Sequence, residues 1–312
     1  MQELLKTGKH TVTALRRAES KVELPEGVKA VTVDYSSEDS LTEALRGHDF
    51  LVISLAVTVA YDDTEATLYR AAARAGVPYV MPNHWNVDIN NEKLIADIMP
   101  DHPWPWPVRK QLLESLGLGW TALCCSFWYE YSLSAYSFHF GFDLKEKAVT
   151  LYDDGNTRIN TSTWEVCGRA VAALLSLPVL PRDEHDTETV TLSRWTNKPL
   201  YVSSWALSQR DMLASVLRVW GDKESDWTIN YQPSEERYHE GRKLVAAGGP
   251  DTQKGFGMAM YVRAFFPNGD GNYEAKYGLA NEVLSLPKED LDEHTRNAKR
   301  MTESNWAYVP GG

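Results

Sequence analysis

Strand-forming runs alternate with helix-forming segments along the N-terminal part of the chain, and this alternation constrains the fold more than any other feature. The strand-forming runs are residues 10–17 (HTVTALRR), 28–34 (VKAVTVD), 49–56 (DFLVISLA) and 78–82 (PYVMP). Segments 38–47 and 63–75 have helical patterns, and a glycine, Gly47 or Gly76, marks where each helix stops. Such an alternation predicts an α/β fold with a parallel sheet that helices cover on both faces.

The rest of the chain predicts a less regular arrangement. Residues 140–160 are expected to form a hairpin with its turn at residues 154–156. We expect Ser162 to cap a helix that runs through Leu177, with Glu165 completing a capping box. Other helices are expected at 107–117, 209–220, 234–247 and over most of 255–302, and other strands at 120–127, 200–208 and 227–234.

Composition excludes several classes of protein. The chain has 312 residues, and 32 basic against 43 acidic side chains give a net charge of −11, which disfavours general binding to nucleic acids. No apolar run is long enough to span a membrane, and no secretory signal opens the sequence. Three cysteines are too few for a disulfide framework, and no metal-ligand spacing is present. We therefore expect a cytoplasmic protein whose partner is a small molecule.

No glycine-rich phosphate-binding turn stands where a doubly wound fold would place it. That fold opens with a strand, a glycine-rich turn and a helix whose N-terminus holds a pyrophosphate. Residues 1–8 instead have the pattern of the last turns of a helix closed by Gly8. We expect the first strand and its turn to be missing, which leaves a gap between runs 10–17 and 49–56 and weakens cofactor binding.

Two arginines follow the run 10–17, at the end of the strand that lies beside the adenosine ribose in this fold. An acid at this position binds a free 2′-hydroxyl, whereas an arginine accommodates a 2′-phosphate. Arg16 and Arg17 stand there, so within this fold we expect them to favour NADPH. The alternative is that both are solvated surface arginines.

Polar and small residues end the next two strands at the same edge. Asp34 is a candidate for a hydrogen bond to the adenine amino group, or else a turn residue before the following serines. Ser54, Leu55 and Ala56 end the apolar strand at the carboxyl edge, where ligands bind in open α/β sheets. The alternative for these three is an ordinary buried strand end.

The loop MPNHWNVD, at residues 81–88, gathers polar and aromatic residues at this edge, as active-site loops do. Asn83 is a candidate for contacting a ligand bound at this edge. His84 is a candidate acid or base. The alternative for His84 is a hydrogen-bonded structural role.

Few residues are candidates for proton transfer or substrate binding. No tyrosine has a lysine four residues later, so the dyad of short-chain dehydrogenases is absent. Lys110 is a candidate donor to a substrate carbonyl, or else a surface residue paired with Glu114. Trp128 and Tyr129 are candidates for lining a substrate pocket, or else belong to the core and its rim.

The ordered fragments resemble the NmrA-like and isoflavone-reductase-like family of atypical short-chain dehydrogenases. The fragments are ELLKTGKHTVTALRR, VKAVTVDYSSEDSLTEALRGHDFLVISLA, AAARAGVPYVMPNHWNVD, RKQLLESLGLGWTALCCSFWYEYSL and FGFDLKEKAVTLYDDGNTRINTSTWEVCGRAVAALLSLP. The last two resemble fungal members of this family, several of which serve secondary metabolism.

This resemblance implies a Rossmann-like NADP-binding domain over residues 1–135 and a smaller α+β substrate lobe over residues 136–312, interleaved with the first. It also implies hydride transfer from NADPH to a small carbonyl-bearing or conjugated metabolite. The family's catalytic lysine falls at Val108 and not at Lys110. Some NmrA-like proteins bind dinucleotide as regulators without turning it over, so a non-catalytic sensor or an inactive truncated homologue are the alternatives.

Overall fold

A four-stranded parallel sheet forms the centre of the N-terminal lobe in the computed structural model, which describes residues 1–55, 63–100, 105–304 and 306. Its strands are β3 (Phe50–Val52), β4 (Tyr79–Met81), β5 (Gly119–Cys124) and β10 (Lys198–Tyr201), in the spatial order β10-β5-β4-β3. Tyr79 lies opposite both Phe50 and Gly119. A side chain at Gly119 would lie 2.7 Å from the ring of Tyr79, so glycine is required at this crossing. The parallel pairing confirms the predicted α/β class.

A second, two-stranded parallel sheet stands beside this one. It contains β1 (Thr13–Arg16) and β2 (Lys29–Thr32), with Thr13 opposite Lys29 and Arg16 opposite Thr32. Among the described strands, neither pairs with β3. Leu15 and Val31 instead pack against the apolar core that contains Leu51 of β3. Side-chain packing, and not a hydrogen-bonded ladder, therefore joins the two sheets.

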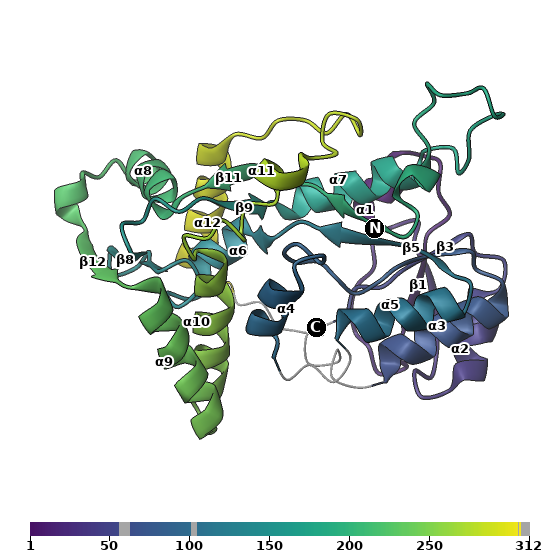
Figure 1. The fold of residues 1–312 in the computed structure, drawn as a ribbon, viewed down its shortest axis with the longest axis horizontal. Helices are drawn as coiled ribbons and strands as arrows, with labels where there is room; N and C mark the ends of the chain where they lie inside the picture. Colours follow the sequence, from purple (N-terminus) through teal and green to yellow (C-terminus); the bar gives the residue numbers. More distant parts are fainter. Residues whose placement is uncertain (56–62, 101–104, 305, 307–312) are drawn as a thin grey trace.

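Helices cover both faces of the parallel strands (Figure 1). α1 (Gln2–Lys6) packs against α7 (Trp164–Leu175) on one face, and α2 (Glu38–Leu45), α3 (Thr64–Ala75) and α5 (Trp106–Ser115) lie together on the other. The side chain of Thr163 caps α7 by accepting a hydrogen bond from Val166, so the prediction of Ser162 as the cap is wrong. No helix in the described ranges is both long enough and apolar enough to cross a membrane.

The second lobe contains two three-stranded sheets and most of the remaining helices. One sheet has the order β11-β9-β6, with β6 (Phe127–Trp128), β9 (Ile159–Ser162) and β11 (Trp205–Leu207). The other has the order β12-β8-β7, with β7 (Phe142–Asp143), β8 (Ala148–Tyr152) and β12 (Thr228–Gln232). The helices are α6 (Tyr129–Ser134), α8 (Gln209–Trp220), α9 (Ser234–Ala247), α10 (Thr252–Ala264), α11 (Glu274–Tyr277) and α12 (Leu291–Glu303). Helix α4 (Glu92–Ile98), which the sequence did not predict, contacts α10 and so links the lobes.

Two predicted strands are each divided between the lobes. The run 120–127 separates into β5 and β6 because Ser126 turns the backbone with a φ of 56°. The run 200–208 is also divided, into β10 and β11, although no residue between these two strands has a positive φ. The apolar pattern continues through Cys124 and Cys125 at the first break, whereas Ser203 and Ser204 interrupt it at the second.

The predicted hairpin at residues 140–160 is also wrong in its pairing. β7 and β8 form the antiparallel pair, with Phe142 opposite Val149, and residues 144–147 connect them. A turn does follow β8, because the backbone nitrogen of Gly155 donates to the carbonyl of Tyr152 at 2.8 Å. That turn leads to β9, which belongs to the other sheet.

Candidate functional site at the carboxyl edge of the sheet

Arg16 ends β1 beside an open pocket of about 580 Å³. The pocket is lined by Arg16, Lys21, Ala30 and residues 22–28. Arg17 is exposed, and its guanidinium lies 5.8 Å from the ring centre of Tyr35. Of the two predicted arginines, Arg16 therefore lines the pocket, together with Lys21, which the sequence analysis missed, and with Glu23 and Glu26.

Asp34 is exposed after β2 and binds its own turn. Its carboxylate accepts hydrogen bonds from the hydroxyl and the backbone nitrogen of Ser36, at 2.6 and 2.9 Å. These two bonds lower the pKa of Asp34 below its usual value, so the side chain is ionised at neutral pH. The turn role considered in the sequence analysis is thus present, and the contact with adenine stays a prediction.

Asn83 joins the ends of β3 and β4. Its side-chain oxygen accepts from the backbone nitrogen of Leu55 at 3.0 Å, and its side-chain nitrogen donates to the carbonyl of Leu55 at 3.3 Å. The neighbouring Ser54 is exposed. The structure therefore brings together Ser54, Leu55 and Asn83, whereas Ala56 lies outside the described residues.

A buried ion pair holds Asn83 in place. Glu65 of α3 accepts a hydrogen bond from the backbone nitrogen of Asn83 at 2.9 Å and pairs with Arg109 of α5 at 3.1 Å. The side chains of Arg109 and Glu65 are only 10% and 7% exposed. Tyr69 also donates to Glu65. Two helices that are distant in sequence thus fix the carboxyl end of β4.

Lys110 points elsewhere, although it follows Arg109 directly. Successive residues of a helix point about 100° apart. The ammonium of Lys110 lies 3.9 Å from Glu114, and both side chains are about half exposed. Lys110 lines a separate pocket of about 260 Å³ together with other residues of α5 and with Glu92 of α4, and neither Asn83 nor His84 lines that pocket. The surface pairing considered in the sequence analysis is therefore what the structure shows.

His84 is buried, and its Nε2 lies 2.8 Å from the carbonyl oxygen of Val87. Burial lowers the pKa of His84 to about 3, so the ring is neutral at physiological pH and its N–H donates to Val87. The following residues tie strand ends together. Trp85 donates to the carbonyl of Ile53, and the carbonyl of Asn86 accepts from Cys125 and Ser126.

Trp128 and Tyr129 face different surroundings. The half-buried ring of Trp128 lies 6.1 Å from the ring of Trp164 at the start of α7. Tyr129 is fully buried, and its hydroxyl lies 2.7 Å from that of Thr295 in α12. Trp128 therefore stays a candidate for a substrate contact, whereas Tyr129 packs in the core of the second lobe.

The geometry defines a class of protein: an open parallel sheet, covered by helices, with polar loops at the carboxyl ends of its strands, as in dinucleotide-binding folds. Residues 1–129 match the family model described as NAD(P)H-binding. Among related proteins, the oxidoreductase aprR of Aspergillus flavus is 27% identical over 292 residues, which cover 91% of this chain and 88% of aprR. The oxidoreductase poxI of Penicillium oxalicum is 21% identical and covers 93% of this chain and 86% of its own length.

Solved structures agree with this assignment of the fold. A crystal structure of isoflavone reductase superposes with a TM-score of 0.70 at 17% identity, covering 94% of this chain and 92% of that one. The NADPH-dependent quinone oxidoreductase QOR2 of Escherichia coli, complexed with NADPH, gives a TM-score of 0.65 at 18% identity, with coverages of 95% and 93%. Residues 1–129 therefore match an NAD(P)H-binding model, and the whole chain has the fold of isoflavone reductase, which supports the predicted resemblance to the NmrA-like and isoflavone-reductase-like family.

Substitution of the two neighbouring basic residues of α5 should separate their roles. Arg109→Met leaves Glu65 buried without its partner, and we expect a loss of about 3 kcal/mol in the free energy of unfolding. Lys110→Met removes only an exposed contact and should cost at most about 0.5 kcal/mol. Urea unfolding of both variants measures the difference. Equal losses would contradict the assignment of Arg109 to a buried ion pair and of Lys110 to an exposed one.

The buried neutral His84 should make the fold sensitive to acid. Its pKa is about 3 in the folded chain against an ordinary value of 6.5, so below pH 6.5 the unfolded state binds a proton that the folded state does not. Stability should therefore fall as the pH decreases from 6.5 towards 3. In His84→Gln the free energy of unfolding should decline less steeply over this range. His185→Gln, at an exposed position, should keep the wild-type slope, and an unchanged slope in His84→Gln would contradict the assignment.

Proposed function

We propose that the protein is an NADPH-dependent reductase that acts on a small carbonyl-bearing or conjugated metabolite. The observation that carries this proposal is the pocket at the end of β1, where Arg16 and Lys21 stand at the edge used for the adenosine phosphate in dinucleotide folds. Support comes from the NAD(P)H-binding family model and from the NADPH complex of a structural neighbour.

The residues at this edge fit the adenosine half of NADPH. Arg16 would bind the 2′-phosphate through its planar guanidinium, with Lys21 as a second cation and Arg17 as a further candidate. Asp34 would accept a hydrogen bond from the adenine amino group. We assign no residue to the pyrophosphate, because no glycine-rich turn joins a strand to a helix within the described ranges.

The residues that join β3 and β4 would flank the ribose and nicotinamide. These are Ser54, Leu55 and Asn83, and the neighbouring Ala56 belongs to the same proposed set. Among them, the backbone of Asn83 is held by the buried pair of Glu65 and Arg109 described above. A site held in this way needs little rearrangement when a ligand binds.

NADPH supplies a hydride when it is bound, and the protein must supply or relay a proton. Lys110 and His84 are the proposed donors. Lys110 carries an ammonium group on a half-exposed, long side chain. His84 would have to donate from a neutral ring whose N–H already binds Val87. Trp128 would contact the substrate beyond the end of β6.

A non-catalytic dinucleotide sensor is the second candidate function. One observation favours it: Lys110 lines a pocket that contains neither Asn83 nor His84, and the resemblance places the family's lysine at Val108, which cannot donate a proton. In this case the Arg16 pocket would still bind NADPH, and the second lobe would respond to the bound cofactor.

We further propose that residues 1–135 form the cofactor domain and residues 136–312 the substrate lobe. β10 returns from the second segment to the first sheet, which supports interleaving of the two. A cytoplasmic location and a role in secondary metabolism belong to the same proposal, supported by the resemblance to fungal oxidoreductases.

Turnover separates the two functions. The protein is incubated with NADPH and a panel of small carbonyl and conjugated compounds, while the nicotinamide absorbance is recorded. We expect oxidation that depends on one class of compound and that decreases in Lys110→Met if Lys110 is the donor. Tight binding of NADPH without oxidation would support the sensor, and absence of binding would contradict both functions.

The Arg16 pocket predicts a preference between cofactors. Arg16→Ala removes a charge-assisted hydrogen bond of about 1.5–3 kcal/mol, so the Kd for NADPH should rise about tenfold or more. The Kd for NADH, which lacks the 2′-phosphate, should change little. Arg46→Ala, at an exposed arginine that pairs with Glu43, is the control and should leave both values unchanged. Equal weakening of NADPH and NADH in Arg16→Ala would contradict the phosphate role.

A further inference from the structure

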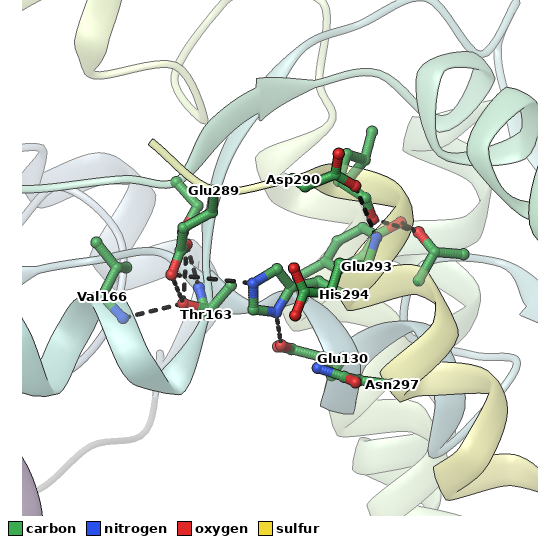
Figure 2. Close-up of polar contacts among 12 residues, drawn as sticks. Glu130, Thr163, Val166, Glu289, Asp290, Glu293, His294 and Asn297 are labelled. Atoms are coloured by element: carbon green, nitrogen blue, oxygen red, sulfur yellow. Dashed lines mark hydrogen bonds and ion pairs between the residues drawn. The ribbon is translucent and has the colours of Figure 1, made fainter. Parts of the chain in front are cut away.

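Three side chains that commonly bind metal ions converge between α6, the first turn of α7 and the first turn of α12. They are Glu130, Glu165 and His294. One carboxylate oxygen of each glutamate and one ring nitrogen of the histidine all lie within 4.8 Å of one another. Figure 2 shows His294 between Glu130 on one side and Glu289 on the other. No motif in the sequence indicated this cluster, because 164 residues separate Glu130 from His294.

One atom of the cluster lacks a partner. Glu130 is only 3% exposed, and its Oε1 lies 2.5 Å from Nδ1 of His294. Its other oxygen, Oε2, is buried and has no hydrogen-bond partner among the described residues. A buried carboxylate oxygen without a partner costs free energy. This atom therefore points to a positively charged ligand that completes the cluster.

The imidazole of His294 is oriented as in metal-binding histidines. Such histidines usually direct their second ring nitrogen towards a carboxylate, which fixes the ring. Here Nε2 lies 3.9 Å from Glu289, whose side chain is 4% exposed. Glu289 is itself held by the hydroxyls of Thr163, at 2.9 Å, and Ser204, and by Arg169 at 3.2 Å. Nδ1 is thereby left to face Glu130.

We propose that Glu130, Glu165 and His294 bind a divalent transition-metal ion of the zinc type. Two carboxylates and a neutral imidazole match its charge of +2, and a mixed set of oxygen and nitrogen ligands favours zinc over magnesium, which prefers oxygen alone. Glu165 is the most exposed of the three. The ion and its water molecules therefore enter the cluster from the side on which Glu165 lies.

Without an ion the same residues form a charge cluster. Burial opposes a charge on His294, but its hydrogen bond to Glu130 and the charges of Glu130, Glu289 and Glu165 outweigh it and raise the pKa. In this arrangement Nδ1 of His294 hydrogen-bonds to Oε1 of Glu130, and Oε2 of Glu130 has no partner among the described residues. A protonated histidine alone therefore accounts for only part of the geometry.

Calorimetric titration of the full chain with Zn²⁺, after treatment with a chelator, tests the proposal. We expect one ion per chain, with much weaker binding of Mg²⁺. Glu165→Gln removes an exposed ligand without disturbing the core and should weaken Zn²⁺ binding by about tenfold or more. Glu293→Gln changes a neighbouring exposed glutamate of α12 outside the cluster and should bind Zn²⁺ as the wild type does.

A second probe separates this site from the buried cysteines Cys124, Cys125 and Cys167. Co²⁺ bound to thiolates gives intense charge-transfer absorption, whereas Co²⁺ bound to oxygen and nitrogen does not. We expect weak d–d bands alone, and their loss in Glu165→Gln. Stoichiometric binding that Glu165→Gln leaves unchanged, thiolate absorption, or absence of binding would overturn the proposal and leave the charge cluster. None of these results depends on the proposed reductase activity.

Discussion

The buried ion pair between Glu65 and Arg109 is the interaction on which the carboxyl edge of the sheet depends. It joins α3 to α5, and through Glu65 it holds the backbone of Asn83. The side chain of Asn83 in turn binds both the backbone nitrogen and the carbonyl oxygen of Leu55, which follows β3. Strands as short as β3 and β4 cannot fix their own ends by ladder hydrogen bonds alone. The side-chain network compensates, and because a buried pair contributes little net stability, its main effect is to define one geometry.

The two lobes are continuous through their strands. β5 runs on into β6 and β10 runs on into β11, so two neighbouring strands of the first sheet both continue into the second lobe, where β9 lies between their extensions. The side chains on these extensions, Trp128 among them, are therefore positioned by the first sheet. The distance of these side chains from the carboxyl edge of the first sheet is therefore set by continuous strands and not by a separate linker.

Local signals in the sequence predicted local structure well. The predicted range 209–220 coincides with α8, whose ends are set by neighbouring residues: Ser208 and Asp211 form a capping box, and Gly221 ends the helix with a φ of 72°. The sequence could not show which of two adjacent basic residues faces inward, because Arg109 is directed by Glu65, 44 positions earlier. The sequence also could not show that β5 and β6 are separate strands, because a single residue of positive φ, Ser126, divides them within one predicted run. The metal-ligand cluster depends on three elements brought together only by the fold.

The separation of the β1–β2 sheet from β3 has a consequence for cooperativity. Regions held by side-chain packing alone open more readily than regions tied by a ladder, and their opening free energy can fall below that of the whole domain. Arg16 and Lys21 lie on this unit. A ligand that binds there stabilises the closed state of the unit, and its apparent affinity is reduced by the fraction of time the unit is open. Ligand binding in the pocket and the opening of the β1–β2 unit are therefore linked equilibria. A measurement of one gives information about the other.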